Sequence, residues 1–332
     1  MRHRMTRRIR TLSGVAAALL ALAGAGCGRD RPVAELEAQP AELRLDYPRF
    51  AVLTLTLRIT GERPGGPGPL PIVFVHLLDG SGTVVRTFDH PFPAAWRVGA
   101  TVEDRVTLYQ SALARPLAPG PYRLTVGLYD PERRWPLAAG VEADRREYVA
   151  ATVAVGGTDP DVPSFHFSES WLPPQSRGDV QVLAQRWLSG ESRIRLTGIR
   201  QGGTLWLRLR IPPPQFEGFT LTLAEGAAQP AVLVSSGCSG GEEVSLSGSG
   251  AHEVSLRVDP IEAKKADPGP AKKGEAPAAA AGGPEEGTGG ACEISLRPNF
   301  SFTSGAQALR QSAALEVLAW GPQQPAPPAP AP

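Results

Sequence analysis

Four side chains of the types that bind metal ions lie close together in the first third of the chain: His76, Asp79, Asp89 and His90. The turn Gly80-Ser81-Gly82 would pair the two segments that carry them, and two imidazoles with two carboxylates could hold a zinc ion that activates water for hydrolysis. The alternative is structural, because His76 shares a strand face with Phe74 and Asp79 begins a turn. None of the spacings is typical of a strong metal motif, so we favour the structural interpretation and expect no cofactor.

Other catalytic motifs do not occur in the sequence. It contains no GxSxG, no HExxH, no phosphate-binding glycine loop and no DxDxDG calcium loop. Its five histidines are widely spread. We therefore predict a protein that is not an enzyme. The competing hypothesis, a metal-dependent hydrolase, would need His76 or His90 to meet Asp89 in a cleft.

A second group of candidate binding residues lies in the segment 204–211, TLWLRLRI. Successive residues of a strand face opposite sides, so the leucines and Ile211 would point inward. Three side chains would point outward: Trp206, Arg208 and Arg210. An exposed indole can stack on a sugar ring, and guanidinium groups can bind hydroxyl or acidic groups. These three are the candidate ligand-binding residues, whereas Trp171 and Trp187 suit a structural role in the core.

The N-terminus has the organisation of a secretory signal peptide over residues 1–26. Five arginines precede an uncharged segment rich in Ala and Leu, which is short for a transmembrane helix. The segment ends at Cys27 and resembles the lipobox of bacterial lipoproteins, although Gly24 stands where a leucine is expected. The resemblance implies that Cys27 carries acyl chains such as palmitate and anchors the protein to a membrane. Plain cleavage of the signal peptide and an uncleaved anchor are the alternatives. Gly28 after the cysteine favours the outer membrane, with the protein facing the periplasm.

Two cysteines remain after Cys27, namely Cys238 and Cys292. An even pair in an oxidising compartment predicts a disulfide. Two free thiols or a redox pair are the alternatives, and no CxxC spacing favours a redox pair. The bond would brace the strands that border the segment 262–290.

The composition predicts an all-β fold. The 332 residues include 37 Gly and 34 Pro, which disfavour long helices and suit short strands joined by turns. The length fits two domains. The formal charge falls from +1 to −4 when the five arginines of the first ten residues are removed, so nothing predicts nucleic-acid binding.

Residues 33–156 are predicted to form an immunoglobulin-like β-sandwich of about seven strands, after a tether at 27–32. Its clearest element is the hairpin 71–90. The stretches FVHLLDGSG, FDHPF and PGPYRLTVGLYDPERRWPL resemble a β-sandwich module found on the extracytoplasmic side of bacterial envelope proteins, often appended to mannosyltransferase-like glycosyltransferases. The resemblance implies a fold and a compartment, and it supplies no catalytic residues.

Residues 163–321 are predicted to form a jelly-roll-like sandwich of nine short strands. The stretches FHFSESWLPP and QRWLSGESRIRL resemble a second module that accompanies similar glycosyltransferases. The composition of 262–290 predicts a disordered insertion between two neighbouring strands, Glu253–Val258 and Glu293–Leu296. The Pro- and Ala-rich tail 322–332 is also predicted to be disordered.

These features together predict a non-catalytic lipoprotein of the cell envelope that binds or scaffolds envelope components, including polysaccharide. A purely structural assembly protein without a small ligand is the alternative. The expected partners are the membrane, through the lipid anchor, and either a polysaccharide or an envelope protein.

Overall fold

The computed structural model describes residues 31–64, 66, 68–177, 183–238, 241–260, 290–304, 307–309 and 311–322. All regular structure in these residues is β, with 26 strands in five sheets. None of the described residues forms a helix that could cross a membrane. The predicted signal peptide and Cys27, nearly all of the predicted insertion, and the tail from Gln323 lie outside the described residues.

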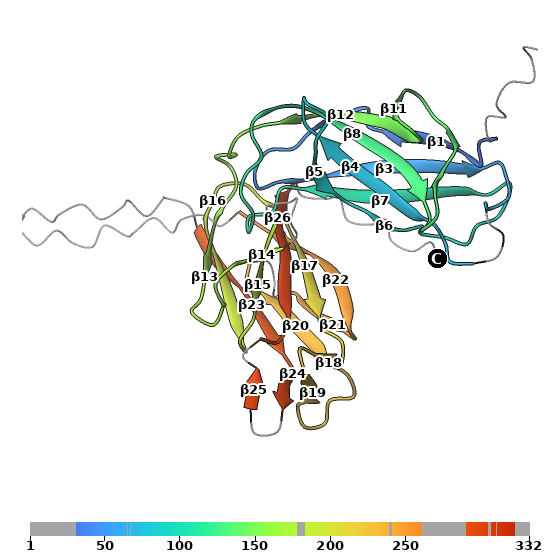
Figure 1. Ribbon diagram of the computed structural model, residues 1–332. Helices are drawn as coiled ribbons and strands as arrows, with labels where there is room; N and C mark the ends of the chain where they lie inside the picture. The colour runs from blue at the N-terminus through green and yellow to red at the C-terminus, as the bar shows by residue number, and fades with distance from the viewer. Residues whose placement is uncertain are drawn as a thin grey trace, which may run out of the picture.

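The first sandwich packs a four-stranded sheet against an eight-stranded sheet (Figure 1). The smaller sheet has the order β10 (Leu137–Ala138), β1 (Ala34–Gln39), β3 (Phe50–Ile59) and β7 (Thr101–Tyr109). The main path of the larger sheet is β11 (Glu142–Asp144), β12 (Glu147–Val155), β8 (Gly120–Tyr129), β4 (Ile72–Leu78) and β5 (Val84–Thr87). Three short strands pair beside this path, each with a longer one: β2 (Glu42–Arg44) with β12, β6 (His90–Pro91) with β4, and β9 (Arg134–Trp135) with β8.

The alternation of side chains explains how these strands pack. In β3 the alternating residues from Leu53 to Ile59 are at most 1% exposed, so they face the opposite sheet. In β4, Val73, Val75 and Leu77 fill the core, while His76 shares the opposite face with Phe74, as the alternation predicted. His76 is half-buried on that face and does not lie in the core, where we expected a structural histidine. Both faces of β4 are therefore largely covered.

The hairpin predicted at 71–90 is confirmed. His76 pairs with Thr87 across β4 and β5. At the turn, the Asp79 carboxylate accepts hydrogen bonds from the backbone N–H groups of Ser81 and Thr83. The Ser81 hydroxyl and these N–H groups favour the ionised carboxylate and lower the pKa of Asp79. Asp79 thus stabilises the turn, which is the structural role predicted for it.

The second sandwich consists of two five-stranded sheets and a smaller four-stranded sheet. One sheet has the order β13 (Ser164–Phe167), β16 (Ser192–Ile199), β23 (Gly290–Pro298), β20 (Ala231–Ser236) and β21 (Glu243–Ser247). The facing sheet has the order β14 (Gln175–Arg177), β15 (Leu183–Trp187), β26 (Ala314–Gly321), β17 (Gly203–Ile211) and β22 (Gly250–Val258). The small sheet has the order β18 (Gln215–Phe216), β19 (Phe219–Leu223), β24 (Phe300–Ser304) and β25 (Gln307–Leu309).

The all-β class with two consecutive sandwiches is confirmed, and two details are corrected. The sandwiches contain β1–β12 and β13–β26, which is more than the expected seven and nine strands, because many strands have only two to four residues. The strands on either side of the predicted insertion are not neighbours. β22 pairs with β17, whereas β23 pairs with β16 and β20 in the facing sheet. The immunoglobulin-like and jelly-roll-like subtypes remain predictions.

The predicted disulfide between Cys238 and Cys292 is present, with the two Cα atoms 5.1 Å apart. Cys238 follows β20 and Cys292 lies in β23, so the bond reinforces the pairing of these two strands at one end. Cys238 is 5% exposed and belongs to the hydrophobic core of the second sandwich.

The two sandwiches meet roughly as an L and share backbone hydrogen bonds at the corner (Figure 1). The Ala112 N–H donates to the Leu318 carbonyl over 2.7 Å, and the Trp320 N–H donates to the Pro48 carbonyl over 2.9 Å. The hydrophobic core of the first sandwich also includes Trp206 from β17 and two residues of β26, Val317 and Ala319. The junction therefore has buried hydrophobic side chains and backbone hydrogen bonds, as the interior of a single domain does.

Candidate functional site

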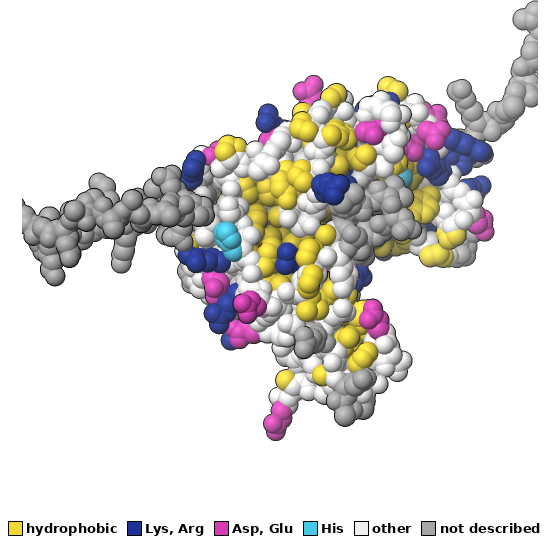
Figure 2. Space-filling view, turned by 60° about the vertical axis from the view of Figure 1, so that its left-hand side comes forward, with side chains coloured by type: hydrophobic (Ala, Val, Ile, Leu, Met, Phe, Trp, Pro, Cys, Tyr) yellow, Lys and Arg dark blue, Asp and Glu magenta, His cyan; other side chains and the backbone are white. Residues whose placement is uncertain are grey.

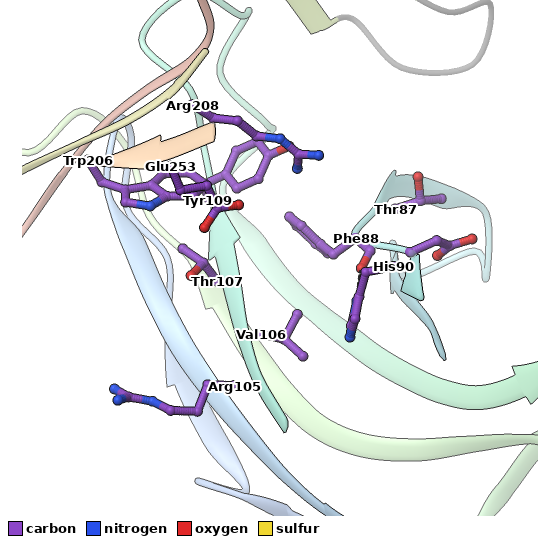
Figure 3. Close-up of a pocket in the computed structure, with 11 residues that line it drawn as sticks. Thr87, Phe88, His90, Arg105, Val106, Thr107, Tyr109, Trp206, Arg208 and Glu253 are labelled. Atoms are coloured by element: carbon purple, nitrogen blue, oxygen red, sulfur yellow. Dashed lines mark hydrogen bonds between the residues drawn. The ribbon is translucent and has the colours of Figure 1, made fainter. Parts of the chain in front are cut away.

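A pocket of about 340 Å³ lies at the junction of the two sandwiches (Figure 3). We call it the junction pocket. Its walls come from the segment Thr87–His90, from β7, and from β17 and β22 of the second sandwich. Small-molecule sites are often found between domains, in pockets of roughly 300–1,000 Å³.

The first sandwich contributes two sheet edges to the junction pocket. β5 ends one sheet and β7 ends the other, so the pocket lies on the open side between them. The residues of β7 that face it include Arg105 and Thr107, and Thr87 lies on the opposite wall. An edge strand is paired on one side only, so its other side can line a cavity.

His90 connects the two sheets beside the pocket. Its Nε2 lies 2.7 Å from an Asp104 carboxylate oxygen, and its Nδ1 lies 2.9 Å from the Phe88 carbonyl oxygen. Burial alone would disfavour the charged imidazole, but the bonds to Asp104 and Phe88 outweigh it and raise the pKa of His90 above its ordinary value. Both ring nitrogens are therefore already engaged.

The second sandwich contributes Trp206, Arg208 and Glu253. Arg208 in β17 is directly opposite Glu253 in β22, so the two side chains share one face of the sheet. Arg208 Nε also lies 3.5 Å from a carboxylate oxygen of Glu316, whose side chain is 4% exposed. This buried acid holds the arginine at the edge of the pocket.

The predicted binding residues occupy three different environments. Trp206 points away from the leucines of β17 as expected, but the first sandwich covers it and leaves it 4% exposed. Its ring centroid is 5.3 Å from that of Tyr109 and 6.1 Å from that of Phe50. No sugar can stack on this ring in the assembled chain. Arg208 lines the junction pocket, whereas Arg210 is paired with Glu316 and does not line it.

The metal-site hypothesis is not supported by the geometry. β4 places His76 on its outer face, whereas His90 lies opposite Val73 and faces the core. His76 instead lies between two carboxylates, 3.4 Å from Asp89 and 3.7 Å from Glu147. Within the described ranges, no group of three or more His, Cys, Asp or Glu side chains is arranged to hold a metal ion. His76 and Asp89 line a separate pocket of about 350 Å³, and Asp89 and His90 line the junction pocket, so neither pocket contains all three residues of the hydrolase hypothesis. That hypothesis stays untested.

Several pocket residues were not predicted from the sequence. Arg105, Thr107 and Glu253 have nothing unusual in their local pattern, and only the packing of the two sandwiches brings them together. Asp104 did carry a signal, because it occupies a core-facing position between Val102 and Val106. A carboxylate at such a position needs a buried partner, and His90 supplies it.

The chemistry of the junction pocket is polar and electrically balanced. Its lining contains two arginines and two acids, which offset each other: Arg105, Arg208, Asp89 and Glu253. The hydroxyl groups of Thr87 and Thr107 add further polar surface. Such a lining provides both hydrogen-bond donors and acceptors without a net charge, which suits an uncharged ligand with many hydroxyl groups.

No protein-family model matches the chain, and no curated protein matches its sequence. Among solved structures, a chain described as the Bacteroides ovatus mixed-linkage glucan utilization locus SGBP-B, in complex with a mixed-linkage heptasaccharide, is similar at 10% sequence identity and a TM-score of 0.21. The alignment covers 85% of the present chain and 52% of that chain, so the protein spans about half the length of this neighbour. The fold and the pocket together define an all-β protein of two joined sandwiches with a polar cavity between them.

Proposed function

We propose that this chain is a non-catalytic binding protein of the cell envelope and that its junction pocket binds an uncharged, polyhydroxylated ligand such as a segment of polysaccharide. The observation that carries this proposal is the composition of the pocket, in which charged groups of both signs from both sandwiches and hydroxyl groups from the first sandwich surround one cavity. Directional hydrogen bonds of this kind select the arrangement of hydroxyl groups on a sugar.

The environments of His90, His252 and His166 favour binding over catalysis, whereas His76 lines a separate pocket beside Asp89. His90 uses both ring nitrogens, and His252 Nε2 lies 2.8 Å from the Gly248 carbonyl oxygen. His166 lies on the surface beside Thr197. A general base needs a free nitrogen next to a reacting group, and none of these three residues offers one in a pocket.

The disulfide supports an extracytoplasmic location, because such bonds persist in oxidising compartments. We further propose that Cys27 carries the lipid anchor and that the protein faces the periplasm from the outer membrane. Metabolic labelling with a palmitate analogue should mark the protein, and Cys27→Ser should abolish the label. Labelling that persists in Cys27→Ser would refute the anchor.

Titration of the purified protein with a panel of neutral and acidic oligosaccharides tests the ligand, with calorimetry as the readout. We expect a neutral oligosaccharide to bind, and we expect Arg105→Gln or Glu253→Gln to weaken binding at least about tenfold, because each removes a charge-assisted hydrogen bond. Arg195→Gln is the matched control, since this exposed arginine of β16 does not line the pocket. A wild-type protein that binds no neutral member of the panel would refute the proposal.

The structure also favours a second candidate function, that of a rigid spacer without a ligand. Trp206 and the backbone hydrogen bonds from Ala112 and Trp320 fix the two sandwiches together, as a scaffold would require. The calorimetric panel separates the two functions, because a spacer would bind no oligosaccharide.

A further inference from the structure

A second hollow, of about 410 Å³, lies at the far end of the first sandwich from the junction. We call it the arginine hollow. Two turns form it, one between β8 and β9 and the other between β11 and β12. Six residues line it, and four of them are arginines: Glu132, Arg133, Arg134, Asp144, Arg145 and Arg146.

Two of the arginines fix the shape of the hollow. The Arg134 guanidinium donates to Glu147 over 3.0 Å and to the Arg145 carbonyl over 3.2 Å. The Arg146 guanidinium donates to the Arg134 carbonyl, so each turn holds the other. Arg146 adopts a φ of 56°, an uncommon value for a residue other than glycine. These reciprocal hydrogen bonds hold the two turns against each other and so fix the shape of the hollow.

The other two arginines are available for a ligand. Arg133 and Arg145 are exposed, and neither guanidinium has an ion-pair partner within the described part of the chain. The lining acids, Glu132 and Asp144, offset only half of the four positive charges. Glu147 beneath the hollow is bound to Arg134, so the four arginines exceed these three acids by one positive charge. Crowded arginines of this kind are stabilised by an anion.

The arginine hollow lies close to the point where the N-terminal segment enters the first sandwich. β1 and β10 run parallel, with Ala34 opposite Leu137, and the Val33 N–H donates to the Pro136 carbonyl over 2.9 Å. Residues before Val33 therefore start beside the β9 strand that carries Arg134. Figure 1 shows the start of β1 and the end of β8 at the same end of the sandwich, and Figure 2 shows basic side chains gathered there.

The distance to the proposed lipid anchor is short. Cys27 precedes Val33 by six residues, and a fully extended segment of that length reaches at most about 20 Å. A lipid on Cys27 would thus keep the arginine hollow close to the membrane surface, where phosphate groups are dense.

We propose that the arginine hollow binds the phosphates of anionic lipid headgroups and orients the first sandwich on the membrane. This proposal rests on the anchor of the proposed function only for proximity, and it does not depend on the junction pocket. Each basic residue close to an anionic surface strengthens binding by about fivefold. Guanidinium groups also match phosphate oxygens with paired hydrogen bonds.

Vesicle co-sedimentation tests this surface with the mature chain carrying Cys27→Ser, which removes any acyl anchor. We expect binding to vesicles of equal parts phosphatidylglycerol and phosphatidylcholine, and much weaker binding to vesicles of phosphatidylcholine alone. The double variant Arg133→Gln with Arg145→Gln should lower the partition coefficient at least about tenfold. Both side chains are exposed, so the fold should remain, and circular dichroism checks this.

The matched control is Arg195→Gln with Arg297→Gln, which removes the same charge from exposed positions of the second sandwich. This control should bind like the parent chain. Equal losses in the two double variants would show attraction by net charge alone and would overturn the proposal. Binding of a soluble acidic polysaccharide through Arg133 and Arg145, with no binding to the anionic vesicles, would assign the hollow to a polymer and would also overturn it. Neither result bears on oligosaccharide binding at the junction pocket.

Discussion

At the scale of single residues, His90 makes the stability of the first sandwich depend on pH. It bridges β6 and β7 through Asp104, and Asp89 is the other acid that acts on it. Because its pKa is raised in the folded state, the folded chain binds the proton more tightly than the unfolded chain does. The stabilisation is complete below the unfolded value of 6.5 and is lost as pH rises through the raised folded pKa.

We therefore expect the free energy of unfolding to fall as pH rises above about 6.5 and through the raised folded pKa of His90, and His90→Gln should reduce this dependence on pH. Urea unfolding at a series of pH values measures it. His166→Gln is the control, because it removes an exposed histidine that lies outside the first sandwich. An unchanged slope in His90→Gln would show that the pair with Asp104 is not linked to folding.

The behaviour of Trp206 shows what a local pattern can predict. Alternation in 204–211 correctly placed this ring on the outer face of the second sandwich, away from Leu205 and Leu207. It could not show that Phe50 and Tyr109, far earlier in the chain, cover that face. The same limit applies to Arg105 and Glu253, which share a pocket only because two domains pack together. Contacts between domains have no periodicity in sequence.

At the scale of elements, a glycine in β8 makes room for an aromatic side chain of the neighbouring strand β4. A Cβ atom at Gly127 would lie 2.2 Å from Phe74 and 2.7 Å from the Arg146 carbonyl oxygen. Only a residue without a side chain allows Phe74 to lie flat across β8, where the Arg134 guanidinium stacks 4.9 Å from its ring centre. Gly127 thus helps to position Arg134, one of the residues of the arginine hollow.

Gly127→Ala should destabilise the protein by about 1–3 kcal/mol, because the added methyl group overpacks this contact. Urea unfolding provides the measurement. Gly140→Ala is the matched control, since Gly140 belongs to the same sandwich and a Cβ atom there would meet nothing within 4 Å. Equal stability of the two variants would mean that Phe74 moves aside without cost.

The disulfide acts on the pairing of β20 and β23. It spans 54 residues and encloses β21, β22 and the segment that follows them. In the chain-entropy model, a loop of this length contributes on the order of 4 kcal/mol by restricting the unfolded chain. The sequence predicted the bond from cysteine parity and compartment. The prediction that the strands flanking 262–290 are neighbours was wrong. These strands, β22 and β23, follow each other in the sequence but lie in facing sheets.

The double variant Cys238→Ala with Cys292→Ala should therefore lose up to about 4 kcal/mol of stability. Unfolding with and without a reducing agent gives the comparison. The reducing agent should destabilise the wild-type protein and leave the double variant unchanged. A wild-type protein insensitive to full reduction would show that the bond contributes nothing to folding.

At the scale of the whole molecule, the junction sets the orientation of both candidate surfaces. The backbone hydrogen bonds at Pro48 and Ala112 connect the first sandwich to β26. Gly321, at the end of β26, lies so close to Phe50 that a Cβ atom there would be 2.2 Å from the ring. Such close packing fixes the orientation of one sandwich relative to the other. The junction pocket therefore keeps a fixed geometry relative to the arginine hollow.

Trp206 is the side chain that holds this arrangement together, so Trp206→Ala should separate the two sandwiches. Removing a buried indole lowers the free energy of unfolding by about 3–5 kcal/mol. Here the loss weakens the packing between the two sandwiches. We expect one cooperative unfolding transition to become two and small-angle scattering to report a larger radius of gyration. Trp187→Ala is the matched control, because Trp187 is 5% exposed but packs against Phe216 inside the second sandwich. This control should lower stability without changing the scattering profile.

If Trp206→Ala keeps a single transition and an unchanged profile, the hydrogen bonds at Pro48 and Ala112 would be enough to fix the junction, and the pocket between the sandwiches would not depend on the indole.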